Sequence, residues 1–111
     1  MKLVPKLRDG KFEFKSIAVG TVPSDAHAMI IEEEGMTIVI PTTRDGEDVF
    51  AWISLVQETS LTATGITKAF SAALSDAGIP CNVIAAYYHD HMLVPYTMRN
   101  KAMQLISEIE I

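Results

Sequence analysis

Six apolar residues recur at the spacing of one helix face shortly after the middle of the chain. They occupy positions i, i+3, i+4, i+7, i+8 and i+11, and they are Ile66, Ala69, Phe70, Ala73, Leu74 and Ala77. This pattern predicts an amphipathic α-helix. Gly78 stands where a left-handed C-terminal cap is expected, and Pro80 prevents the helix from continuing. The sequence therefore predicts that the helix ends just before Gly78.

The segments around this helix predict a fixed order of elements. Residues 49–57 (VFAWISLVQ) are apolar and aromatic-rich, as expected of a central strand with Trp52 in the core. Residues 81–88 predict a buried strand, residues 92–95 a short partner after the corner at positions 89–91, and residues 97–108 a second helix. Strand, helix, strand, strand, helix is the ferredoxin-like βαββα series without its last strand.

The N-terminal half, residues 1–48, alternates turn signals with short apolar runs and predicts strands and hairpins. One strand is expected over residues 12–19. Residues 28–31 and 37–40 flank a Glu-Glu-Glu-Gly turn at Gly35, which predicts a β-hairpin; the three glutamates as a helix start are the alternative. Since a sheet edge left open invites another strand, residues 12–19 or 37–40 are predicted to supply the missing strand, within the chain or across a dimer.

Composition and charge narrow the classes of function. A chain of 111 residues makes one domain or two very small ones, here divided as 1–48 and 49–111. The net charge of −5, with no basic cluster, disfavours nucleic-acid binding. Cys81 is the single cysteine, so an intrachain disulfide and a thiolate metal cage are excluded. With no apolar run of about 20 residues and no secretory signal, we expect no membrane partner and a cytoplasmic location.

The turn between the first long strand and the first helix is the best candidate for a binding site. Thr62 or Thr64 is expected to cap the helix, and Gly65 permits close approach of a ligand. The unpaired amides and the positive end of the helix dipole suit a carboxylate. A plain helix cap without ligand is the alternative.

The corner with His89 and His91 is the second candidate. On a continuing strand both imidazoles project to the same side, but zinc catalysis usually needs three protein ligands, and the third histidine, His27, lies in a different segment. A hydrogen-bonded histidine pair is therefore favoured over a metal site, with a ligand contact as a further alternative. No nucleophile motif is present, and Cys81 falls in a buried strand, so catalysis is unsupported.

Several short stretches together resemble the ACT domain, a ligand-sensing module of amino-acid metabolism. The resemblance rests on residues 52–56 (WISLV), 61–66 (LTATGI), 73–74 (AL) and 78–84 (GIPCNVI). Residues 86–91 (AYYHDH), 94–95 (VP) and 33–37 (EEGMT) are similar to short, stand-alone bacterial ACT proteins that lack a catalytic domain.

The resemblance implies a regulatory protein that binds an amino acid between paired domains. It places the first edge of the pocket at Leu61, Thr62, Ala63, Thr64, Gly65 and Ile66 and the second edge at Asn82, Val83 and Ile84. Asn82 can offer an amide oxygen to the ligand's amino group.

We therefore expect an α+β protein, a ferredoxin-like ACT domain preceded by a reduced, β-rich, ACT-like half. It is expected to bind a small amino acid, to form a homodimer, and to need no cofactor, metal or catalysis. The competing interpretations are a metal-binding or hydrolytic protein using His89 and His91, and a pure protein–protein interaction module.

Overall fold

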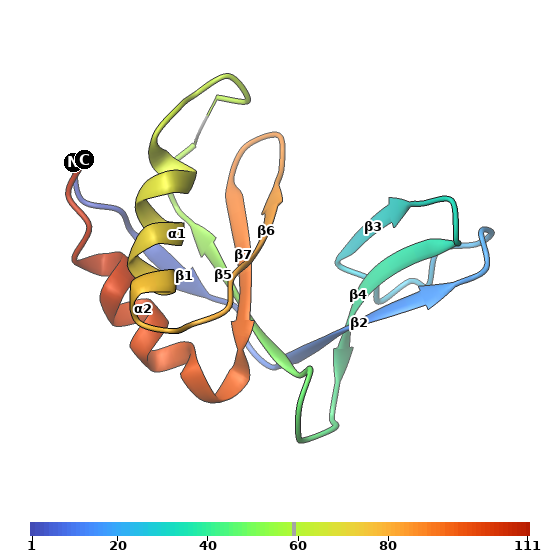
Figure 1. The fold of residues 1–111 in the computed structure, drawn as a ribbon. Helices are drawn as coiled ribbons and strands as arrows, with labels where there is room; N and C mark the ends of the chain where they lie inside the picture. Colours follow the sequence, from blue (N-terminus) through green and yellow to red (C-terminus); the bar gives the residue numbers. More distant parts are fainter. Residues whose placement is uncertain (59) are drawn as a thin grey trace.

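The computed structural model describes residues 1–58 and 60–111, and these residues form an α+β fold. Within them lie seven strands, two α-helices and one 3₁₀ turn (Figure 1). The strands are β1 (Pro5–Leu7), β2 (Lys11–Ile17), β3 (Ala28–Ile31), β4 (Met36–Thr42), β5 (Phe50–Leu55), β6 (Asn82–Ala85) and β7 (Asp90–Pro95). The helices are α1 (Ile66–Asp76) and α2 (Arg99–Ser107), and the 3₁₀ turn is η1 (Tyr96–Met98). The order predicted for residues 49–108 is therefore present as β5, α1, β6, β7 and α2.

The two helices cover one face of the sheet, and strand alternation decides which side chains meet them (Figure 1). Successive side chains of a strand point to opposite faces, so Ala51, Ile53 and Leu55 of β5 pack towards the helices while Trp52 faces the other way. The main core consists of Leu3, Ala51, Ile53, Leu55, Phe70, Leu74, Ile79, Met92, Val94, Ala102 and Ile106. A smaller cluster on the opposite face consists of Phe12, Val39, Trp52 and Leu93. Trp52 is buried, as predicted, but in the smaller cluster.

The missing strand beside β5 comes mainly from the N-terminus. Of the two segments predicted for this position, residues 12–19 contribute in part through β2, which lies next to β5, whereas the prediction of residues 37–40 is wrong because β4 lies one strand further out. Strand β1 pairs antiparallel with β5, with Pro5 opposite Leu55 and Leu7 opposite Ile53. Strand β2 adds a single pair, Phe12 with Phe50, on the same edge of β5. The chain termini lie side by side, and the N-terminal ammonium donates to the carbonyl oxygen of Ile111 at 2.7 Å (Figure 1). Residues 1–7 therefore pack with the segment after residue 48.

The predicted N-terminal strands and hairpin are confirmed, and they extend away from the helical layer (Figure 1). The sheet order is β3-β4-β2-β5-β7-β6, so β2, β4 and β3 form one arm of a single bent sheet. The three glutamates lie in the turn between β3 and β4, where the Glu32 N–H donates to the Gly35 carbonyl at 2.8 Å. They do not start a helix.

Gly35 is a position where any side chain is costly. A Cβ there would lie 2.6 Å from the Ile17 carbonyl oxygen, and the φ angle is +154°. Gly35→Ala is therefore expected to lower the free energy of unfolding by about 1–3 kcal/mol. Urea denaturation measures the loss. Gly20→Ala is the control, because a Cβ at Gly20 meets nothing within 4 Å; equal stability of the two variants would contradict this account of the turn.

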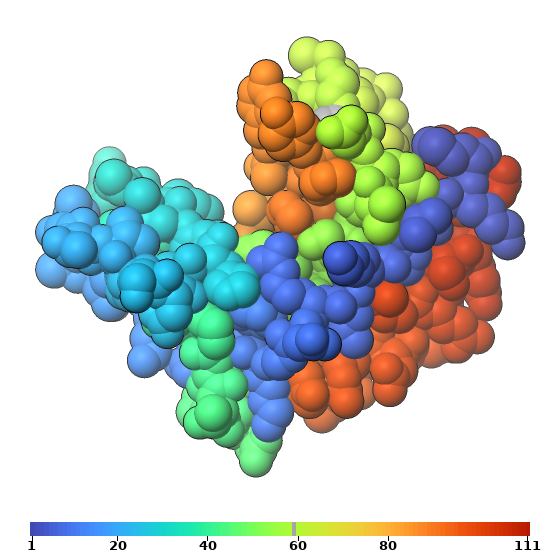
Figure 2. Space-filling model, turned by 180° about the vertical axis from the view of Figure 1, so that it is seen from behind, coloured from blue at the N-terminus to red at the C-terminus, as the bar shows by residue number. Residues whose placement is uncertain are grey.

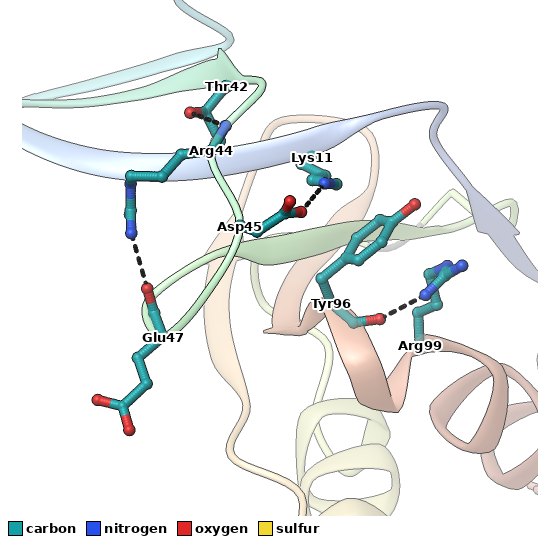
Figure 3. A network of polar contacts seen from close by, with 7 residues as sticks. All are labelled: Lys11, Thr42, Arg44, Asp45, Glu47, Tyr96 and Arg99. Atoms are coloured by element: carbon teal, nitrogen blue, oxygen red, sulfur yellow. Dashed lines mark hydrogen bonds and ion pairs between the residues drawn. The ribbon is translucent and has the colours of Figure 1, made fainter.

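The connection between β4 and β5 is held by backbone and charged contacts (Figure 3). The Arg44 amide donates to Thr42 Oγ1 at 3.1 Å, and its guanidinium Nη1 donates to the Glu47 carbonyl at 3.0 Å. Lys11 of β2 forms an ion pair with Asp45. These contacts hold the connection in shape and tie it to β2.

The helix ends follow the sequence signals closely. Gly78 has a φ of +73°, and the amides of Gly78 and Ile79 donate to the carbonyls of Ser75 and Leu74 at 2.9 Å each. This is the left-handed cap that the Gly78 signal predicts. The second helix begins two residues later than predicted, because residues 96–98 form the 3₁₀ turn η1. Among the described residues, no helix is long and apolar enough to cross a membrane.

Candidate functional site

The predicted turn borders a small crevice at the amino-terminal end of α1. The crevice has a volume of about 130 Å³. Of the predicted residues, Leu61, Ala63, Gly65 and Ile66 line it, together with Ser60, Thr67, Ala85, Ala86 and Asp90. Gly65 is the N-cap residue, with φ 91° and ψ −24°. This left-handed conformation favours glycine over any other residue, so Gly65 sets how the chain enters the helix.

The prediction that Thr62 or Thr64 caps the helix is wrong. In the described chain, α1 has no side-chain cap hydrogen bond. The hydroxyl of Thr62 is hydrogen-bonded instead to Ser60 Oγ at 2.9 Å, and the Thr62 amide donates to the same oxygen at 3.2 Å. A local hydroxyl–backbone turn of this kind competes with helix capping. The first amides of α1 are thus left without a capping side chain beside the crevice.

A carboxylate also lines the crevice. Asp90, the first residue of β7, lines the crevice and is 8% exposed. Asp90 therefore brings negative charge close to the positive end of the α1 dipole.

The structure does not bring Asn82, Val83 and Ile84 into the same crevice within one chain. Asn82 pairs with Leu93 at one end of β6, whereas Ala85 pairs with Asp90 at the other end, next to the turn. The three residues line a groove of about 350 Å³ that β6 forms with Phe14, Ala28, Met29, Ile30, Thr37 and Val39. The Asn82 side-chain amide donates to the Leu93 carbonyl at 3.4 Å.

The histidine corner is hydrogen-bonded, in agreement with the favoured interpretation. His89 Nδ1 lies 3.1 Å from the Gln57 carbonyl oxygen, and His91 Nδ1 lies 2.7 Å from Ser54 Oγ. The ring centroids of the two histidines are 6.5 Å apart. Among residues 1–58 and 60–111, no group of three or more His, Cys, Asp or Glu side chains is placed to hold a metal ion.

A polar cluster around Trp52 is missing from the sequence-based predictions. The Arg8 guanidinium carbon lies 4.2 Å from the centroid of the Trp52 ring, and Arg8 Nη1 lies 2.8 Å from His27 Nδ1. Trp52 Nε1 donates to His91 Nδ1 and to Ser54 Oγ at 3.2 Å each. Alternation along β5 places Trp52 and Ser54 on one face and is a usable sequence signal, but nothing in the sequence brings Arg8 and His27 to them.

The cluster predicts a pH-dependent stability. Burial and the Arg8 charge lower the pKa values of His27 and His91 below the ordinary value of a histidine. The unfolded chain then binds more protons, so stability is complete above about pH 6.5 and is lost as the pH falls through the lower folded-state pKa values. The thermal unfolding midpoint is expected to decrease between pH 7.5 and pH 5.

The double variant His27→Gln/His91→Gln tests the assignment. Its unfolding midpoint should depend less on pH across the same window, because glutamine does not titrate. A wild-type midpoint that stays constant from pH 7.5 to pH 5, or an unchanged slope in the variant, would contradict the assignment.

Comparison with known proteins identifies the family. Residues 46–108 match the model of an ACT domain family, which covers more than half of the chain, so the protein belongs to the ACT domain family. A crystal structure of a Vibrio cholerae protein of unknown function, described as a possible transport protein, is similar at 32% identity with a TM-score of 0.82. The match covers 96% of this chain and 88% of that one.

A second solved structure agrees on the fold. A protein from Agrobacterium tumefaciens is 20% identical, with a TM-score of 0.72 over 96% of this chain and 87% of that chain. At this identity the likeness shows the fold alone. No curated protein matches.

Proposed function

We propose that this chain is a non-catalytic regulatory protein that binds a small amino acid in the crevice at the amino-terminal end of α1. The observation that carries the proposal is one crevice, in a protein of the ACT family, that is bordered both by helix amides without a capping side chain and by a buried carboxylate, Asp90. The ligand carboxylate accepts hydrogen bonds from the amides after Gly65. The ligand ammonium lies towards Asp90.

The crevice limits the size of the ligand. Its volume is about 130 Å³. Pockets that hold larger metabolites usually enclose about 300–1,000 Å³. An amino acid with a short side chain therefore fits better than an aromatic or long basic one.

The same proposal includes a homodimer. Each subunit contains a ferredoxin-like ACT unit, and the two subunits pair through β6. β6 ends the described sheet order, and such an edge offers unpaired backbone groups to another strand. Val83 of β6 is 38% exposed. Pairing along this edge puts Asn82, Val83 and Ile84 at the subunit interface, where they form the second edge of the ligand site.

Light scattering after size-exclusion chromatography tests the dimer. The wild-type chain is expected to elute with twice the mass of one subunit, and Val83→Lys is expected to elute as a monomer. Lys68→Glu on α1, also an exposed position, is the control and should leave the dimer intact. A wild-type monomer would contradict the homodimer.

The proposal that the protein is non-catalytic is supported by the low expected reactivity of its single thiol, Cys81. Burial raises the pKa of Cys81 above its ordinary value, which keeps the sulfur in its unreactive, protonated form. Regulation through ligand binding and oligomerisation remains the proposed activity.

A thermal-shift panel of the standard amino acids, with zinc as a separate condition, tests the binding function. A true ligand stabilises the fold by RT ln(1 + [L]/Kd), about 2.7 kcal/mol at one hundred times Kd. Gly65→Val is expected to abolish the shift. Gly46→Val is a matched control, because Gly46 also has a positive φ and open space around it. A response to zinc alone, lost in His91→Ala, would overturn the proposal.

A further inference from the structure

A second pocket lies on the opposite face of the sheet from α1. Its volume is about 620 Å³, and its polar lining residues are Lys6, Arg8, Asp9, Ser54, His89 and His91. Figure 2 shows the molecule from behind, with the dark-blue N-terminal residues next to green residues and close to the orange β6–β7 hairpin. We call this the Arg8 pocket. It shares none of its lining residues with the crevice at α1.

The guanidinium of Arg8 is held in place by uncharged partners. It stacks on Trp52, with Cζ 4.2 Å from the ring centroid, and its Nη1 donates to His27 Nδ1 at 2.8 Å. Arginine is only a donor, so His27 must be the acceptor and is therefore neutral, with its proton on Nε2. The stack and the hydrogen bond fix the plane of the guanidinium before any ligand arrives.

The positive charge of Arg8 has no partner among the ion pairs of the described residues. These pairs join the N-terminus to Glu110, Lys11 to Asp45, and Arg44 to Glu13. The hydrogen bond to His27 uses one of the five N–H donors of the guanidinium. A partly buried, stacked guanidinium with a planar set of donors is suited to bidentate recognition of a carboxylate.

A second donor is oriented on the same pocket wall. Trp52 Nε1–H and Ser54 Oγ both lie within hydrogen-bond distance of His91 Nδ1, at 3.2 and 2.7 Å. Since the tryptophan N–H can only donate, Nδ1 of His91 accepts, and the proton lies on Nε2. Burial and the neighbouring Arg8 charge lower the pKa of His91, which agrees with a neutral imidazole that donates through Nε2.

We propose that the Arg8 pocket is a second binding site, which takes a small organic carboxylate. Arg8 forms the bidentate contact and His91 donates an additional hydrogen bond. The fixed guanidinium supplies one positive charge. The charges of the exposed Lys6 and Asp9 cancel each other. The site therefore has a net charge of about +1, which matches one carboxylate better than a phosphate dianion. This inference goes beyond the amino-acid site at α1 and does not depend on it.

The fluorescence of Trp52 provides a local readout, because it is the only tryptophan in the chain and lies under Arg8. Acetate, succinate and benzoate are the probes, titrated at constant ionic strength, and inorganic phosphate is the comparison anion. We expect a saturable change in emission with at least one of the carboxylates and weaker binding of phosphate. Isothermal titration calorimetry of the same carboxylate confirms that the emission change reports binding.

Variants separate this site from the crevice at α1. Arg8→Gln is expected to weaken carboxylate binding at least tenfold by calorimetry, and Arg8→Lys to restore only part of it, because lysine lacks the planar fork. Arg44→Gln and Gly65→Val should bind as the wild type does. Circular dichroism verifies that each variant folds.

Three outcomes would overturn the proposal. They are no saturable binding of any of the three carboxylates to the wild-type protein, equal affinity in Arg8→Gln, or tighter binding of phosphate. Loss of binding in Gly65→Val with full binding in Arg8→Gln would assign the carboxylate to the α1 crevice instead.

Discussion

A chain that lacks residues 1–7 is expected to lose cooperative folding. The deletion removes β1 from the edge of β5 and removes Leu3, which is 2% exposed in the main core. It also removes the bonds from the Leu3 amide to the Ile109 carbonyl at 3.1 Å and from the Val56 amide to the Val4 carbonyl at 2.8 Å. A domain of this size is stable by only about 5–15 kcal/mol in total, so losses of this extent remove most of the stability. Near-UV circular dichroism and urea denaturation measure the effect.

A single substitution gives a graded form of this test. Leu3→Ala is expected to lower the free energy of unfolding by about 2–5 kcal/mol, as for other buried leucines. Val4→Ala is the control, because the side chain of Val4 is 49% exposed. If the deleted chain unfolded with the wild-type midpoint, the placement of β1 in the ACT unit would be wrong.

The second large effect is expected at Phe70 on α1. Its side chain is 0% exposed and lies in the main core between the helix and the sheet. Phe70→Ala is expected to cost about 3–5 kcal/mol, because it loses the burial of the ring and leaves a cavity. Urea denaturation should show a lower midpoint with an unchanged m-value.

Lys68 on the same helix provides the control. It is exposed, and Lys68→Ala should change the stability by no more than about 0.5 kcal/mol. A loss at Phe70 no larger than the loss at Lys68 would contradict the helical face that anchors α1 to the sheet.

Periodicity was sufficient to predict the order of the elements after residue 48. The prediction of a buried strand over residues 81–88 is wrong, because β6 spans only Asn82–Ala85, lies at the end of the sheet order and is largely exposed. The apolar positions of α1 are so regular that only a helix satisfies them, and Gly78 ends it as predicted. β1 was not predictable in the same way. It is three residues long and begins with Pro5, and a proline is tolerated there because it stands at the first residue of a strand on a sheet edge. Its pairing is fixed by the docking of Leu3 in the core and by the meeting of the two termini, which a local pattern does not encode.

The candidate sites divide in the same way. The turn at Gly65 was predictable because a glycine before a helix carries a local conformational meaning, and the structure places a crevice beside it. The neighbourhood of Arg8, His27 and Trp52 was not, because it joins three strands or loops far apart in the sequence. Long-range pairing brings them together: the Arg8 amide donates to the Trp52 carbonyl and the His27 amide to the Val39 carbonyl, at 2.8 Å each. The second edge of the ligand site, predicted at Asn82, Val83 and Ile84, stays a prediction, because it requires the proposed dimer.

The most direct test of the central proposal is a titration of the ¹⁵N-labelled protein with the amino acid that gives the largest thermal shift, followed by two-dimensional NMR. The proposal predicts that the amide signals of Gly65, Ile66 and Thr67 move most and saturate together, because their N–H groups bind the ligand carboxylate. Amide signals that stay in place at these three residues while the ligand saturates signals elsewhere would contradict it.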